Sequence, residues 1–125
     1  MDAKEYLKYT HMSNWDVSSV INTQFLFSGK RHINMDISRW DVSNVTDMYR
    51  MFDSNKLFNQ DISRWDVSNV LDMKFMFHNT KSFDQDLSSW GSKLHPDVTV
   101  LGMFKGSPLE GNEPQWYLDK INKGK

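Results

Sequence analysis

The sequence predicts an α/β solenoid of about four 25-residue coils, each with a short parallel β-strand and a short helical turn, capped at both ends. The first reason is an internal repeat, because tryptophans recur every 25 residues, at Trp15, Trp40, Trp65 and Trp90. The second is that WDVSNVTDMYRMF at 40–52 returns nearly unchanged as WDVSNVLDMKFMF at 65–77. A fixed period of about 20 to 50 residues is typical of stacked repeats.

The block that follows each tryptophan predicts the helical turn. Asn44 lies three residues before the carboxylate of Asp47, which is a variant of the capping box at a helix start. Apolar residues then recur every three to four positions, the spacing of one helix face, at Val45, Met48, Met51 and Phe52.

The second shared block predicts the strand. It reads INMDIS at 33–38, FNQDIS at 58–63 and FDQDLS at 83–88, with apolar and polar residues on opposite sides. Copies stacked about 4.8 Å apart would form a parallel sheet of at least three strands. We expect the aromatic positions to form buried rows, consisting of Trp15, Trp40, Trp65, Trp90, Phe27, Phe52, Phe77 and Phe104.

The chain is predicted to be a single domain over residues 1–125, with the repeats at 12–104. The fourth copy is two residues longer than the others and carries Pro96. Residues 1–11 show a short-helix pattern and are predicted to form an N-terminal cap. Terminal repeats are commonly atypical, because one of their faces has no neighbour to stack on.

Residues 105–125 no longer follow the repeat and are predicted to form a C-terminal cap. Pro114 followed by QWYLDKIN predicts a helix with proline in its first turn. We expect Trp116, Tyr117 and Ile121 to cover the end of the last coil. The alternative is a flexible tail.

The pattern WDVSNVTDMxxMF followed by FNQDIS resembles the 25-residue BspA-type repeat, a divergent branch of the leucine-rich repeats. The resemblance extends over residues 12–104. It implies a leucine-rich-repeat-like fold. That family is found in bacterial surface proteins, mycoplasma lipoproteins, phages and large viruses, and its implied role is adhesion or protein binding.

Composition narrows the classes of function. The net charge of −1 gives no argument for nucleic acid or an anionic membrane as partner. The absence of cysteine excludes disulfides and thiolate metal sites. No apolar run reaches the roughly 18 residues of a membrane span, and the N-terminus has no signal-peptide core. The chain as given is therefore predicted to be cytoplasmic, or a surface protein if it is a trimmed fragment.

Catalysis has no support in the sequence. The histidines share no spacing with each other or with a nucleophile, and no phosphate loop or metalloprotease motif is present. We therefore predict a protein that is not an enzyme and binds no cofactor.

Two rows of aspartates raise the question of a cation site: Asp16, Asp41 and Asp66, and Asp36, Asp61 and Asp86. Calcium prefers clusters of oxygen ligands. The favoured interpretation is that each carboxylate accepts hydrogen bonds from backbone N–H groups at its own turn or the next. We therefore predict no metal site, and a cation-binding structural repeat stays an alternative.

The second row is also the predicted binding surface, as part of an outer sheet face. Its residues are Asn34, Asp36, Asn59, Asp61, Asp84 and Asp86. Stacked like charges repel, so they need either Arg39 and Arg64 nearby or a basic partner. The leading hypothesis is a protein-binding module, in a sharper version a small phage- or virus-encoded inhibitor of a host factor. The alternative from another class is a fragment of a bacterial surface adhesin.

Overall fold

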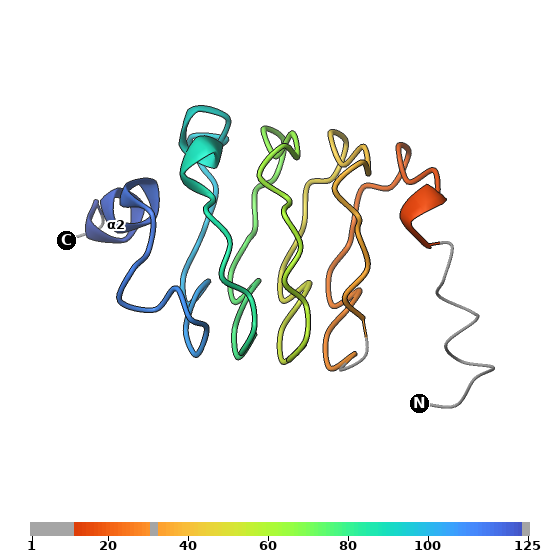
Figure 1. Ribbon diagram of the computed structural model, residues 1–125. Coiled ribbons are helices and arrows are strands. Elements are labelled where there is room, and N and C mark those ends of the chain that lie inside the picture. Colours follow the sequence, from red (N-terminus) through yellow and green to blue (C-terminus); the bar gives the residue numbers. More distant parts are fainter. Residues whose placement is uncertain (1–11, 31–32, 124–125) are drawn as a thin grey trace.

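The computed structural model describes residues 12–30 and 33–123. Its helical elements are the 3₁₀-helices η1 (Met12–Asn14) and η2 (Ser88–Ser92) and the α-helix α2 (Gln115–Asn122). The chain between them winds in successive irregular coils that lie side by side, with η1 at one end of the row and α2 at the other (Figure 1). The predicted N-terminal cap, residues 1–11, lies outside the described residues.

We number the coils by the tryptophan that each contains, from the first to the fourth: Trp15, Trp40, Trp65 and Trp90.

The predicted α/β solenoid with a parallel sheet and helical turns is wrong. In the described part of the chain there is no sheet, and the blocks at 33–38, 58–63 and 83–88 are not strands. The β-type pairing consists of isolated parallel bridges: Asn22 with Asp47, Asp47 with Asp72, and Asp72 with Thr99. These bridges lie in the block that was expected to be helical.

Tight turns explain why a helical spacing occurs in a segment that is not a helix. Met51 N donates to Met48 O at 3.1 Å, and Asn55 N donates to Phe52 O at 2.9 Å. Each of these bonds closes a four-residue turn, so apolar residues three or four apart face the same side. Arg50 is the third residue of the first of these turns and has a φ of 52°, a left-handed conformation that an α-helix does not contain.

Left-handed residues recur at two positions in every coil. At the first position they are Phe25, Arg50, Phe75 and Gly102, and at the second they are Gly29, Ser54, Asn79 and Gly106. Only glycine adopts this conformation without a steric cost, and the fourth coil has glycine at both positions. The repeated backbone shape therefore depends on strained residues in the earlier coils.

Backbone hydrogen bonds join each coil to the next. Between the second and third coils, the N–H groups of Met48, Arg50, Phe52 and Ser54 donate to the carbonyls of Asp72, Lys74, Met76 and His78, at 2.7–3.0 Å. Four equivalent bonds join the first coil to the second and the third to the fourth. The coils are thus held together as the strands of a sheet would be, although their backbone is not regular enough to form one.

The core consists of aromatic rows that run along the stack. Trp65 is 1% exposed, and its Nε1 donates to Ile37 O, 28 residues earlier, at 3.0 Å. Trp40 and Trp90 make the same bond to the preceding coil. The phenylalanine rings stack as well, with centroids 5.5 Å apart for Phe52 and Phe77.

Trp15 differs from the other three tryptophans, since it is 51% exposed. No coil precedes it among the described residues, so the expected fourth ring of the buried tryptophan row is missing.

At the other end, α2 closes the stack. Pro114 is its N-cap residue, and Trp116 stacks on Trp90 with centroids 6.5 Å apart. Trp116 Nε1 donates to Leu87 O at 2.8 Å, which repeats the bond made by the tryptophans of the coils. Tyr117 packs edge-on against Phe104, whereas Ile121 is exposed. A residue of the cap thus takes the next place in the tryptophan row.

Candidate functional site

One face of the stack carries a connected group of aromatic side chains and an arginine, which we call the aromatic row: Phe25, Tyr49, Arg50 and Phe75. Ring centroids are 5.4 Å apart for Phe25 and Tyr49, and 6.4 Å apart for Tyr49 and Phe75. Arg50 Cζ lies 4.4 Å from the centre of the Phe75 ring, within the range of a cation–π contact. The aromatic row therefore crosses the first three coils without a break.

The backbone beneath this row is strained. Phe25 and Phe75 have φ angles of 61° and 56°, and a left-handed conformation costs a residue with a Cβ about 1–2 kcal/mol. The fourth coil has Gly102 here, and a Cβ on it would lie 2.3 Å from the Phe75 ring. Bulky residues in such a conformation are uncommon, and strain of this kind is concentrated at functional sites.

An exposed aliphatic side chain lies beside the aromatic row in the fourth coil. Leu101 is 64% exposed. Phe75 N donates to Leu101 O at 3.0 Å, which places the fourth coil's leucine beside the aromatic row. An exposed apolar surface of this kind is typical of an interaction site.

Asp53 fixes the arginine of the aromatic row. It accepts hydrogen bonds from Arg50 Nη1 at 2.6 Å and Ser54 Oγ at 3.0 Å, and His78 Nδ1 lies 2.8 Å away. Arg50 Nε also donates to the hydroxyl of Tyr49 at 3.0 Å. Burial acts to raise the pKa of Asp53, but the hydrogen bonds from His78, Arg50 and Ser54 outweigh it, so the pKa lies below its ordinary value. Asp53 is therefore ionised at neutral pH and holds Arg50 in place.

Among the described residues, the two cations that lie against the rings of this row are each paired with a carboxylate. Lys74 Nζ lies 2.9 Å from Asp72 Oδ2, as Arg50 lies against Asp53. Paired charges leave the aromatic and aliphatic carbon surface as the dominant feature of this face.

The amides of the predicted binding surface are used within the protein. Asn34 Oδ1 accepts from Asn59 N at 2.9 Å and from Gln60 Nε2 at 3.0 Å. Asn59 Oδ1 accepts in the same way from Asp84 N and Gln85 Nε2, at 2.9 and 2.8 Å. Each side chain joins one coil to the next, and this bonding between coils takes the place of the expected sheet.

The carboxylates of that surface are exposed and close their own turns. Asp36, Asp61 and Asp86 each accept from the backbone N–H of the serine two residues later, at 2.9–3.0 Å. Hydrogen bonding to these serines lowers the pKa of all three carboxyls. The charge of Arg64 lowers the pKa of Asp61 further, whereas the charge of Asp36 raises it. The row is thus ionised and exposed, but it does not lie on a sheet face.

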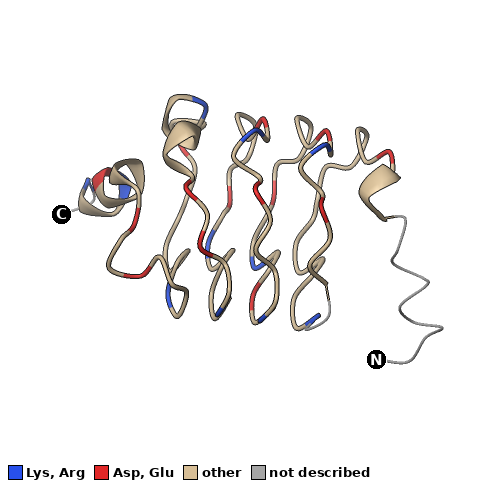
Figure 2. Cartoon of the chain, viewed as in Figure 1, with Lys and Arg blue, Asp and Glu red and all other residues tan. Residues whose placement is uncertain are grey.

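The other aspartate row makes the same turns. Asp16, Asp41 and Asp66 accept from both the N–H and the hydroxyl of the serine two residues later, with Oγ–Oδ1 distances of 2.5–2.6 Å. Figure 2 shows acidic residues recurring at matching places in successive coils. Within residues 12–30 and 33–123, no three histidine, cysteine or acidic residues are grouped so as to hold a metal ion. No helix in this part of the chain is long and apolar enough to cross a membrane.

These features define the chain as a repeat protein of stacked irregular coils with one strained aromatic face. Residues 2–116 match the family described as Mycoplasma protein of unknown function, DUF285, so the chain belongs to this family. No curated protein and no solved structure matches the chain.

Sequence reasoning missed the aromatic row. The residues concerned stand at the two variable positions of the pattern DMxxMF, where copies differ, and a repeat search gives such positions no weight. The one signal in the sequence is that three of the six residues at these positions in the first three coils are aromatic, namely Phe25, Tyr49 and Phe75, beside Gln24, Arg50 and Lys74.

Proposed function

We propose that this chain is a non-enzymatic protein-binding module, and that the aromatic row forms the centre of its binding surface. The observation that carries the proposal is the strain: Phe25 and Phe75 occupy left-handed positions although their side chains are not in the core. A role in folding alone would favour glycine there, as at Gly102. Aromatic and arginine side chains are also the residue types that dominate the energy of protein interfaces.

The chemistry of the surface favours an apolar partner. Arg50 and Lys74 are already paired with carboxylates, so a charged partner would have to replace existing ion pairs. A partner with aliphatic or aromatic side chains would instead bury the rings and the neighbouring Leu101, with a gain of about 25 cal/mol for each Å² of apolar surface removed from water.

The resemblance of the repeats to BspA-type sequences supports the same class of function, since that family is associated with adhesion and protein binding. Within this class, a small phage- or virus-encoded inhibitor that covers a host factor is the sharper version. A fragment of a surface adhesin is the alternative, and it would use the same kind of contact.

The proposal is tested with the full chain as bait in lysates of its own organism and of a plausible host. The test variant is Phe25→Gly with Phe75→Gly, which gives both positions the residue that the fourth coil has. The matched control is the exposed aspartate row changed to asparagine, Asp36→Asn, Asp61→Asn and Asp86→Asn. We expect a stoichiometric partner that the glycine variant loses and the asparagine variant keeps. A partner lost only by the asparagine variant would move the binding surface to the aspartate row.

A further inference from the structure

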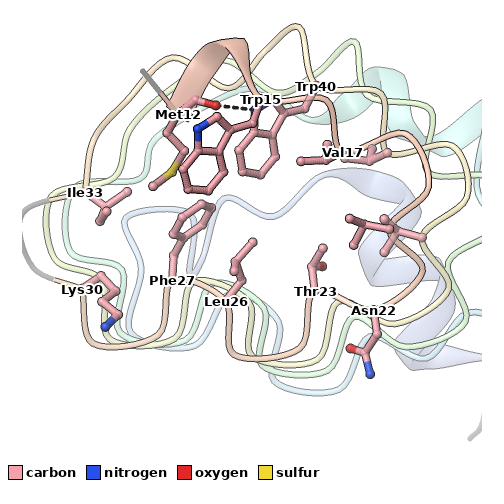
Figure 3. Close-up of a pocket in the computed structure, with 13 residues that line it drawn as sticks. Met12, Trp15, Val17, Asn22, Thr23, Leu26, Phe27, Lys30, Ile33 and Trp40 are labelled. Atoms are coloured by element: carbon pink, nitrogen blue, oxygen red, sulfur yellow. Dashed lines mark hydrogen bonds between the residues drawn. The ribbon is translucent and has the colours of Figure 1, made fainter. Parts of the chain in front are cut away.

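The hollow at the end of the first coil, of about 370 Å³, is explained by the repeat. Figure 3 shows Trp15, Leu26 and Phe27 pointing into it. The position of Leu26 is held in the next two coils by Met51 and Met76, which are fully buried. This hollow is therefore the end of the core, lined by side chains of types that the repeat buries elsewhere.

A second hollow, of about 500 Å³, is lined by polar and basic residues and has no such explanation. We call it the lysine hollow, and its lining comes from the first three coils: Gly29, Ser54, Lys56, Asn79 and Lys81. Ser54 and Asn79 are left-handed residues with polar side chains, at the position where the first coil has Gly29. Figure 2 shows basic residues recurring at the lower turns of successive coils. The backbone strain of the aromatic row thus has a counterpart in this polar surface.

The lysine hollow lies beside the aromatic row, and Asp53 joins the two. One oxygen of its carboxylate accepts from Arg50 of the row at 2.6 Å, and the other accepts from Ser54, which lines the hollow, at 3.0 Å. The Nδ1 of His78 lies 2.8 Å from Asp53, and the ring centroids of His78 and Phe75 are 5.8 Å apart. The rings and the lysines are therefore neighbouring parts of one surface.

The lysines of the hollow carry charge that the protein itself does not neutralise. Among the ion pairs of the described residues, none includes Lys56 or Lys81, whereas Arg50 and Lys74 of the aromatic face are both paired. Lys81 Nζ donates to the carbonyl of Gly106 at 3.3 Å, which leaves two of its three donors. No acidic residue is among the described residues that line the hollow. The lysine hollow is thus suited to an anionic group.

We infer that the protein bound by the aromatic row presents an acidic segment, whose apolar side chains cover the rings and whose carboxylates enter the lysine hollow. The inference rests on the proposed function, to which it adds the chemistry of the partner. Carboxylates placed here would form ion pairs with Lys56 and Lys81 without breaking an existing pair. The rings would supply apolar contact, and the lysines would select the partner by its charge.

An extended segment that runs along the stack would meet both features at once. In an extended chain, alternate side chains point to opposite sides and recur on each side about every 6.6–6.8 Å. The ring centroids of Phe25, Tyr49 and Phe75 follow one another at 5.4 and 6.4 Å. A segment that alternates apolar and acidic residues would therefore place its apolar side on the rings and its acidic side over the lysines.

A single-stranded nucleic acid, which also combines rings with positive charge, fits this surface less well. Successive bases stack on the faces of aromatic side chains. The rings of the aromatic row stand edge to face, with interplanar angles of 90° and 78°. Arg50 lies over the face of Phe75, and Lys74 lies over the face of Tyr49. The row is therefore not a platform of free parallel faces, and the geometry favours a peptide.

The test is the binding of three dye-labelled peptides to the full chain, measured by fluorescence anisotropy. The peptides share leucines at alternate positions and flexible glycine–serine ends, and they differ only in having glutamate, glutamine or lysine between the leucines. We expect the glutamate peptide to bind about fivefold more tightly than the glutamine peptide at low salt. This preference should decline as the salt concentration rises.

A pair of double variants identifies the source of the preference. Lys56→Gln with Lys81→Gln should remove the preference for glutamate and leave the affinity for the glutamine peptide unchanged. The matched control is Lys120→Gln with Lys123→Gln, at α2, which removes the same charge and should keep the preference. The glycine variant of the aromatic row should weaken the binding of both peptides.

Four results would overturn the inference. They are equal binding of the glutamate and glutamine peptides, tighter binding of the lysine peptide, no binding of any peptide, and equal loss of the preference in both lysine double variants. Binding of single-stranded oligothymidylate that only the Lys56 and Lys81 variant loses would replace the acidic segment by a nucleic acid.

The inference and the proposed function can fail separately. Equal binding of the glutamate and glutamine peptides, weakened for both in the glycine variant, would overturn the inference and leave the aromatic row as a binding surface. A preference for glutamate with affinities that the glycine variant does not change would contradict the role of the aromatic row instead.

Discussion

Trp65→Phe and Trp15→Phe change the same repeat position in two coils, of which only the coil of Trp65 is packed against a preceding coil among the described residues. The comparison tests whether the contact between coils stabilises the fold. Trp65 and Trp15 occupy the same place in their repeats, yet Trp65 is 1% exposed and Trp15 is 51% exposed. Trp65 Nε1 donates to Ile37 O, whereas the indole of Trp15 has no such partner among the described residues. The pair thus differs in its surroundings and not in residue type.

The expected cost of Trp65→Phe is about 1.5–3.5 kcal/mol. Removing the indole N–H takes one of two hydrogen bonds from the carbonyl of Ile37, which still accepts from Trp40 N at 3.1 Å, so the lost bond costs about 0.5–1.5 kcal/mol. The smaller ring also leaves a void beside Phe52, whose centroid is 6.5 Å from that of Trp65. Trp15→Phe removes no buried hydrogen bond and should change the free energy of unfolding by no more than about 0.5 kcal/mol.

The measurement is urea unfolding followed by tryptophan fluorescence, because each variant keeps four of the five tryptophans. The quantity to compare is the loss in the free energy of unfolding that each variant shows relative to the unmodified chain. Equal losses in the two variants would refute the reasoning, since they would show that the contact with the preceding coil contributes nothing beyond the position itself.

Three further predictions concern turns and charges. Gly106→Ala should lower the free energy of unfolding by at least about 2 kcal/mol in urea titrations, because its Cβ would lie 2.3 Å from Asn79 Oδ1. The control is Gly111→Ala, which is also at positive φ but in open space and should cost about 1 kcal/mol. Asp53→Asn should lower the free energy of unfolding by about 1–2 kcal/mol, because the bonds to Arg50 and His78 are lost. An unchanged urea midpoint would contradict this prediction. Hydrogen bonds from serines lower the pKa of the aspartates of the two rows in the folded chain below the ordinary value of an aspartate. Their contribution to stability is therefore complete above the ordinary pKa and is lost as the pH falls through the folded-state pKa. Urea midpoints should decline below about pH 4, and a flat profile down to about pH 2 would be the contrary result.

The sequence predicted the repeat and most of its buried positions because packing between coils acts on residues one period apart. Trp40, Trp65 and Trp90 are buried in a row, and so are Phe52 and Phe77. Trp15 does not follow them, since its exposure depends on what lies beside the first coil and not on its own repeat. Periodicity thus identifies equivalent positions, but it does not identify the ends of the stack.

The secondary structure was predicted wrongly for a reason that lies in the backbone. The spacing of Met48, Met51 and Phe52 fits one face of a helix and also fits consecutive four-residue turns. The φ of Arg50 and the backbone bonds to the next coil distinguish the turns from a helix. Neither feature can be seen in the sequence, because arginine gives no sign of a left-handed conformation. Asn34 and Asn59 were likewise predicted to belong to a binding surface, although their side chains bond to the next coil. The sequence does not show which side chains make such bonds.

The same left-handed position links the fold to the proposed function. Its cost of about 1–2 kcal/mol for each of Phe25, Arg50 and Phe75 adds up to an appreciable part of the 5–15 kcal/mol by which domains are typically stable. The buried aromatic rows and the backbone bonds between coils can offset this cost, and Gly102 demonstrates that the backbone shape does not require a side chain there. A chain under selection for stability alone would therefore carry glycine in all four coils. The retention of two phenylalanines and an arginine on the outer surface is explained if that surface is used for binding.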